Sequence, residues 1–195
     1  MLPFVILSSM KNYYCTLIII ICSALYPVAG TGQVAPGAID NDLLAESIEE
    51  VLGVQQAAEW IQKTIPAEVK LSVDGKLKIK QSLPDTLHVG KVKTDNGVCY
   101  IIPDIAPSKS EKYSYVLYLN ENKEIVDVDV LEYRENYGYE IDYSFFREQF
   151  HGKSDPREVR FKRSIQNISG ATISARSLTY SVRDLLTLMQ KMELN

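Results

Sequence analysis

One stretch near the C-terminal end of the chain, residues 164–176, combines small residues, hydroxyl side chains and the predicted start of a helix. Apolar side chains recur every three to four residues over positions 173–189, and this spacing predicts a helix that begins at about Thr172 with Ser169 as its N-cap. A helix start presents unpaired backbone N–H groups and a partial positive charge. The chemistry that this stretch favours is therefore the binding of a phosphate group.

The neighbouring residues fit the same chemistry. Gly170 and Ala171 leave room for a phosphate to approach, and Arg176, one turn into the helix, could add a charge-assisted hydrogen bond. Ser, Gly, Ala and Thr are also common at ordinary helix starts. The spacing alone leaves both interpretations open.

Composition limits what the rest of the chain can be. With 195 residues, of which 46% are hydrophobic and 24% charged, the chain suits one globular domain plus an apolar N-terminal segment. The formal net charge is -4, and no basic cluster is evident in the sequence. We therefore expect no nucleic acid as the main partner.

Cysteine and histidine positions argue against a metal or iron–sulfur site. Cys15 and Cys22 lie in the apolar N-terminal run, which leaves Cys99 alone in the body of the chain. The two histidines, His88 and His151, show no metal-ligand spacing. The sequence predicts neither an internal disulfide in the body nor a metal centre.

The N-terminus predicts export from the cytoplasm. Residues 16–25 form an apolar run of secretory length, preceded by Lys11 and followed by small residues at positions 28–30. We expect residues 1–30 to be a signal peptide cleaved near Thr31, or an N-terminal membrane anchor if cleavage does not occur. In both cases the body is periplasmic or otherwise extracytoplasmic.

Periodicity predicts an α+β body with N-terminal helices, an antiparallel sheet and a C-terminal helix. Residues 31–97 are expected to hold the N-terminal helices and first strands, and residues 98–195 a second domain. The expected helices are 43–52, ended by Gly53, then 54–65, and a short one at 145–150. The expected strands are a hairpin over 69–79, then 86–92, 97–102, 113–119 and 125–133, with a loop at 103–110.

Residues 131–143, which follow the last predicted strand, contain four tyrosines, four acidic residues and one glycine. One interpretation is a solvated strand end and loop. The other is a ligand-facing loop, in which Gly138 allows a close backbone turn, the tyrosines supply flat surfaces, and Glu132, Glu135 or Arg134 supplies a polar anchor. Both interpretations fit this segment taken alone.

Three separated segments together resemble a known family. Ile168-Ser-Gly-Ala-Thr-Ile-Ser174 before an amphipathic helix resembles the signature of the FMN-binding domain family. Residues 125–138 are similar to that family's strand and Glu- and Gly-containing loop, and residues 145–153 to its Phe- and Gly-Lys-containing stretch. The resemblance covers roughly residues 98–192 and is closest to a secreted single-domain branch. The family's best-known members are periplasmic subunits of the sodium-pumping NADH:quinone reductase and Rnf-type complexes.

The resemblance implies a cofactor and a site. In that family FMN is joined through its phosphate to the last threonine of the motif by a flavin transferase that uses FAD and magnesium. Here that residue is Thr172. The resemblance also implies cofactor contacts from the rest of the motif and the upstream loop, namely Ser169, Gly170, Ala171, Ser174, Arg176, Glu135 and Gly138. The family usually has an aspartate where this chain has Gln166.

These implications lead to one main hypothesis and two alternatives. The main hypothesis is an exported FMN-carrying electron carrier that works with a membrane redox partner, a redox flavoprotein rather than a stand-alone enzyme, with no catalytic acid or base of its own. The first alternative is a noncovalent FMN-binding or sensing module, which Gln166 suggests. The second is a cofactor-free interaction domain of the cell envelope.

Overall fold

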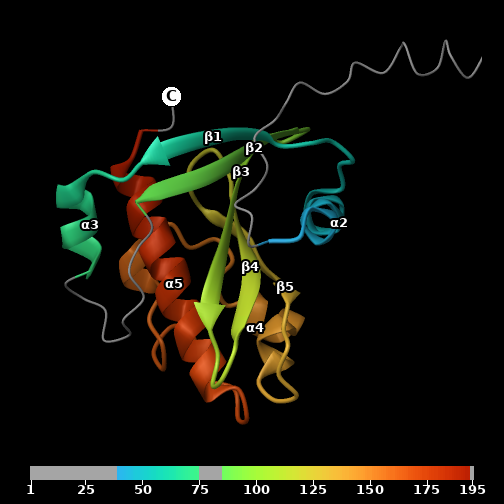
Figure 1. Ribbon diagram of the computed structural model, residues 1–195, viewed down its shortest axis with the longest axis vertical. Helices are drawn as coiled ribbons and strands as arrows, with labels where there is room; N and C mark the ends of the chain where they lie inside the picture. Colours follow the sequence, from blue (N-terminus) through green and yellow to red (C-terminus); the bar gives the residue numbers. More distant parts are fainter. Residues whose placement is uncertain (1–38, 75–84, 194–195) are drawn as a thin grey trace, which may run out of the picture. The chain divides into compact units, whose positions relative to one another are not determined.

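A computed structural model describes residues 39–74 and 85–193, all within the compact unit that runs from residue 34 to 195. Residues 1–30, predicted to be a signal peptide or a membrane anchor, and the second half of the predicted hairpin lie outside the described residues. The described residues form one antiparallel sheet whose five strands are neighbours in sequence order (Figure 1). The strands are β1 (Glu59–Thr64), β2 (Thr86–Thr94), β3 (Gly97–Pro107), β4 (Lys112–Leu119) and β5 (Ile125–Glu132). Together with the helices below, this sheet confirms the predicted α+β class.

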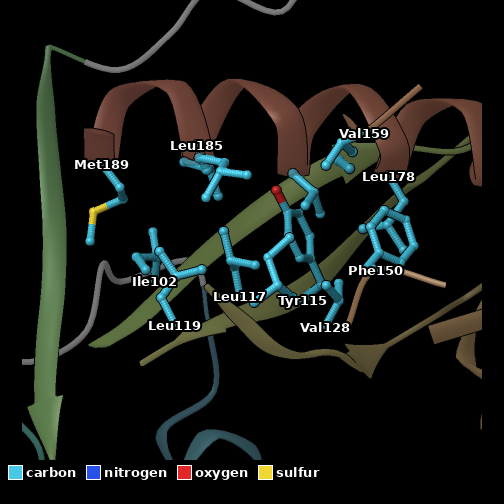
Figure 2. Close-up of a cluster of buried hydrophobic side chains, with 14 of the residues drawn as sticks. Ile102, Tyr115, Leu117, Leu119, Val128, Phe150, Val159, Leu178, Leu185 and Met189 are labelled. Atoms are coloured by element: carbon cyan, nitrogen blue, oxygen red, sulfur yellow. The ribbon is translucent and has the colours of Figure 1, made fainter. Parts of the chain in front are cut away.

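The C-terminal helix α5 (Thr172–Lys191) covers one face of the sheet. Figure 2 shows Leu178, Leu185 and Met189 pointing from α5 toward Ile102 and Leu117 on the strands. All five side chains are buried, and they belong to the larger of two hydrophobic clusters. This packing fixes the direction of α5, and hence the position of its first turn.

Helix α2 (Asn41–Leu52) covers the other face, where a second cluster forms around Ile48 and Val116. Asp40 caps the start of α2, and Gly53, at φ 68°, ends it in the left-handed conformation. The predicted helix over 43–52 with its stop at Gly53 is confirmed.

The predicted second helix over 54–65 is wrong, because residues 59–64 form β1 and pair with β2. Trp60 lies opposite Gly90 in this pairing, and a β-carbon on Gly90 would approach the Trp60 ring to 3.2 Å. The missing side chain at position 90 therefore makes room for the indole. Contact with a distant strand decides the conformation here, since intrinsic preference is a weak prior.

The predicted hairpin is also wrong in its first half, where Ala67–Asp74 forms helix α3. Pro66 precedes the helix, its carbonyl oxygen accepts hydrogen bonds from the amides of Val69 and Lys70, and Glu68 lies in the first turn. These are helix-start features, which the alternating pattern of residues 69–73 concealed. The predicted loop at 103–110 is shorter than expected, since β3 continues to Pro107.

Short elements connect β5 to α5 and carry the tyrosine-rich segment. They are η1 (Tyr139–Asp142), α4 (Ser144–Arg147) and η2 (Pro156–Glu158). The half-buried Arg147 forms ion pairs with Asp127 and with Asp129 at 2.7 Å, both on β5, and a longer contact of 3.4 Å with Asp142. These contacts hold the segment that follows β5 against the sheet.

Candidate functional site

Helix α5 begins at Thr172, as the sequence predicts, but its N-cap is Ala171 rather than Ser169. A capping side chain must belong to the residue directly before the first helical one, and alanine has no group that could accept a hydrogen bond. Ser169 is exposed two residues further out, and Gly170 at φ 91° turns the chain between them. The predicted capping role of Ser169 is therefore wrong.

The first turn of α5 keeps its backbone donors available. Within the described residues no side chain caps this helix, and the first intrahelical bond is donated by Ala175 to Ala171 at 2.8 Å. The amides of residues 172–174 thus have no acceptor of their own, at the positive end of a 20-residue helix. Thr172 and Arg176 are both exposed and lie one turn apart, on the same side of the helix.

The hydroxyl of Thr172 is held by a residue that no sequence pattern singled out. Asn167 Nδ2 donates a hydrogen bond to Thr172 Oγ1 at 3.0 Å. The preceding residue, Gln166, is exposed, and its backbone amide donates to Gln149 Oε1 at 2.6 Å. A side-chain amide five residues before a threonine is not a recognisable sequence motif. The turn at Gly170 brings the side chains of Asn167 and Thr172 together.

The loop around Gly138 packs directly on the first turn of α5. Gly138 is buried at φ 95°, and a β-carbon there would lie 2.4 Å from Tyr133 Oη and 3.0 Å from Ser174 Oγ. Tyr133 donates its hydroxyl proton to the carbonyl of Tyr137 at 2.9 Å, so at 2.7 Å its oxygen accepts from Ser174. Tyr113 donates to the carbonyl of Ser174 at 3.1 Å. The structure therefore brings Gly138 and Ser174 together, in a partly buried hydrogen-bond network at the helix start.

Glu135 binds the turn between β3 and β4. Its Oε1 accepts hydrogen bonds from the Ser108 hydroxyl, from the amide of Ser110 at 2.7 Å and from the amide of Glu111 at 2.8 Å. These donors lower the pKa of the carboxyl group. The observed role of Glu135 is to hold this turn, and its predicted contact with a cofactor stays a prediction.

Glu140 is a carboxylate beside the motif that the sequence alone did not single out. Its Oε1 is 3.4 Å from the place where a β-carbon on Gly170 would stand. Its Oε2 is buried, with no hydrogen-bond partner in the described part of the chain. An orphaned buried oxygen is costly, and such groups occur where a ligand or solvent completes the site.

An exposed aromatic surface adjoins this site; it consists of Tyr137, Tyr139, Tyr143 and Phe145. Tyr137 is 81% exposed and Phe145 56%. The ring of Tyr143 lies 6.0 Å from that of Tyr139 and 5.8 Å from that of Phe145, measured between centroids. Ile173, expected on the buried face of α5, is instead exposed. Gly138 lies against Ser174, and Glu140 lies beside Gly170, so these aromatic residues belong to the segment that packs on the motif.

Metal-binding and membrane-spanning features are absent from the same residues. Over positions 39–74 and 85–193, no cluster of His, Cys, Asp and Glu side chains is suited to hold a metal ion. None of the helices placed by the structure has the length and apolar character to span a bilayer.

Comparison with known proteins gives a family match. The family model of the FMN-binding domain matches residues 109–187. This range includes β4, β5, the tyrosine-rich segment and most of α5. A search of curated proteins finds no match to the chain.

Proposed function

We propose that this protein is an extracytoplasmic electron carrier with FMN attached through its phosphate to Thr172. The family model of the FMN-binding domain matches residues 109–187, which supports FMN as the cofactor. The observation that carries the proposal is the uncapped first turn of α5. It combines free backbone donors with an exposed threonine hydroxyl.

The site residues fit a phosphodiester. The amides of residues 172–174 point toward the end of the helix, where an anion is stabilised by the helix dipole. Arg176 lies one turn further on the same side and supplies a positive charge. Gly170 takes a left-handed conformation that leaves the approach open.

Attachment requires Thr172 Oγ to form a bond to the phosphorus of the FMN half of FAD. The bridging P–O bond breaks, AMP leaves, and the hydroxyl proton passes to a base of the flavin transferase. Asn167 donates to Thr172 Oγ, so one lone pair is engaged while the hydroxyl proton remains free to be removed. We propose that Asn167 orients the hydroxyl for this reaction.

The aromatic surface is the proposed neighbour of the isoalloxazine ring. Tyr137, Tyr139, Tyr143 and Phe145 offer exposed rings on the segment that packs against the motif, and flat aromatic groups favour stacked contacts. When bound, FMN supplies the redox chemistry, and the chain supplies tethering and orientation. The apolar N-terminal segment supports a location outside the cytoplasm, near a membrane redox partner.

The test is the intact mass of the chain after coexpression with a flavin transferase. We expect an increase equal to FMN minus one water. Thr172→Ala should abolish the increase, whereas Thr172→Ser, which keeps a hydroxyl, and Ser169→Ala, which removes a neighbouring one, should retain it. An increase that survives in Thr172→Ala would contradict the proposed attachment point.

A noncovalent FMN-binding module is the second candidate, because Gln166 stands where the family usually has an aspartate. In that case the mass would stay unchanged, and the yellow colour of the purified protein would be released by acid precipitation. A covalent flavin would remain in the pellet.

A further inference from the structure

A second concentration of charge lies outside the flavin site, in a hollow of about 600 Å³. Four cationic side chains and one carboxylate line this hollow, together with His151, Gly152 and Ser164. The charged residues are Lys153, Arg157, Arg160, Arg163 and Glu158. The expectation that the sequence holds no basic cluster is wrong for residues 153–163, where five of the eleven residues are basic, although the chain as a whole carries a net charge of -4.

The backbone that carries these cations is fixed. Ile125, on β5, forms two hydrogen bonds with the turn below the hollow: its amide donates to the carbonyl of Lys153 at 2.9 Å, and its carbonyl accepts from Gly152 at 2.8 Å. These bonds hold residues 152 and 153 against β5 at the edge of the sheet. The side chain of Lys153 therefore extends from a backbone segment that is fixed in place.

The two central arginines stand on an equally well-defined turn. The Arg160 carbonyl accepts hydrogen bonds from the amides of Arg163, Ser164 and Ile165, all at 3.1 Å. The Ser164 hydroxyl accepts from the Arg160 amide at 3.1 Å and donates to the Glu158 carbonyl. Ile165 has no exposed surface and anchors the turn in the core. The turn is held by its own backbone bonds, which leaves the arginine side chains available.

The charges on these arginines are not neutralised within the described residues. Of the four cations, Arg157 forms an ion pair, with Asp155. Between residues 85 and 193, no carboxylate lies within ion-pair distance of Lys153, Arg160 or Arg163. Cations that are held close together on a fixed backbone repel one another. Such an arrangement is expected where a bound anion offsets the repulsion.

From this geometry we propose that the hollow is a binding site for phosphate-bearing anions. Arginine presents a planar fork of donors that matches phosphate oxygens in pairs, and lysine adds a point charge. Because the hollow is shallow and polar, it recognises a charged group rather than enclosing a whole ligand. The site shares no residue with the first turn of α5 and does not depend on the proposed flavin function.

The test is a titration of the full chain with inorganic pyrophosphate at low ionic strength, followed through backbone amide resonances. We expect saturable shifts concentrated in residues 151–164. The double variant Arg160→Gln, Arg163→Gln should weaken the apparent Kd at least tenfold. The control variant Lys93→Gln, Lys112→Gln, which removes the same charge from exposed strand positions, should stay within twofold.

Three results would overturn the proposal: no saturable shift, shifts centred on residues 169–176, or equal weakening in the arginine and lysine variants. If the double arginine variant does not fold, Arg163→Gln alone serves as the second variant, with an expected loss of at least threefold.

A second arm of the experiment identifies the source of the phosphate. Vesicles of phosphatidylglycerol are compared with vesicles of phosphatidylcholine for binding of the same variants. If the double arginine variant binds phosphatidylglycerol vesicles more weakly than the double lysine variant does, the ligand is a lipid headgroup. If the two variants bind these vesicles equally, the ligand is a free phosphate compound.

Discussion

Replacing Gly138 with alanine tests whether the tyrosine-rich loop and the start of α5 form one unit. The added methyl group would lie 2.4 Å from Tyr133 Oη, closer than a β-carbon normally approaches another atom, and 3.0 Å from Ser174 Oγ, which is tighter than most such contacts. Those two hydroxyls are hydrogen-bonded to each other at 2.7 Å. Either the tyrosine or the first turn of α5 has to move.

Two contributions set the size of the effect. A residue with a β-carbon in the left-handed region costs about 1–2 kcal/mol, and Gly138 has φ 95°. Loss of the Tyr133–Ser174 hydrogen bond adds roughly 0.5–1.5 kcal/mol. We therefore expect Gly138→Ala to lower the free energy of unfolding by about 1.5–3.5 kcal/mol.

The chain offers a matched control in Gly53, which also has positive φ (68°) but where an added β-carbon would meet no atom within 4 Å. Gly53→Ala should show the backbone contribution alone, about 1 kcal/mol. The measurement is urea denaturation of both variants, read by circular dichroism. If the two variants are destabilised equally, the packing of the loop on α5 contributes nothing, and the reasoning fails.

Two further predictions concern carboxyl groups. Burial raises the pKa of Asp104, whose carboxylate accepts a hydrogen bond from Tyr115 at 2.8 Å. The folded state therefore binds the carboxyl proton more tightly than the unfolded state does. As a result, the wild-type protein loses stability as the pH rises above about 4, the ordinary pKa of aspartate. Asp104→Asn should therefore gain stability relative to wild type between pH 4 and pH 7 in denaturation experiments, and a constant difference would contradict this. Hydrogen bonds lower the pKa of Glu135, so its contribution is present at neutral pH and is lost on acidification through the folded pKa. Glu135→Gln should accelerate hydrogen exchange at the amides of Ser110 and Glu111, and unchanged protection would show that the carboxylate does not hold the turn.

Local patterns predicted the parts of the fold that depend on local causes. Asp40 and Gly53 bound α2 as capping residues do, and the apolar spacing of α5 fixed its start at Thr172. The β1 strand could not be found in this way, because its conformation depends on the space that Gly90 leaves for Trp60. That contact joins residues thirty positions apart, and no local pattern reports it.

The candidate site was predictable in its location and less so in its contacts. Gly138 and Ser174 lie together at the helix start, and their contact with a cofactor stays a prediction. Asn167 and Glu140 were missed, because their proximity to Thr172 and Gly170 arises from the left-handed turn at Gly170 and from the packing of η1. Ser169 was assigned the wrong role because a serine near a helix start is ordinarily its cap.

The absence of a cap on α5 links the local structure to the proposed chemistry. A serine or aspartate at position 171 would satisfy one or two first-turn amides and stabilise the helix by about 0.5–2 kcal/mol. Ala171 gives up that stability, and the buried contacts of Leu178, Leu185 and Met189 hold the helix in place instead. The first-turn amides therefore remain open to an external anion, next to a threonine hydroxyl that accepts a hydrogen bond from Asn167. A helix that is anchored by its core and left uncapped at its start is a suitable attachment point for a phosphate-linked cofactor.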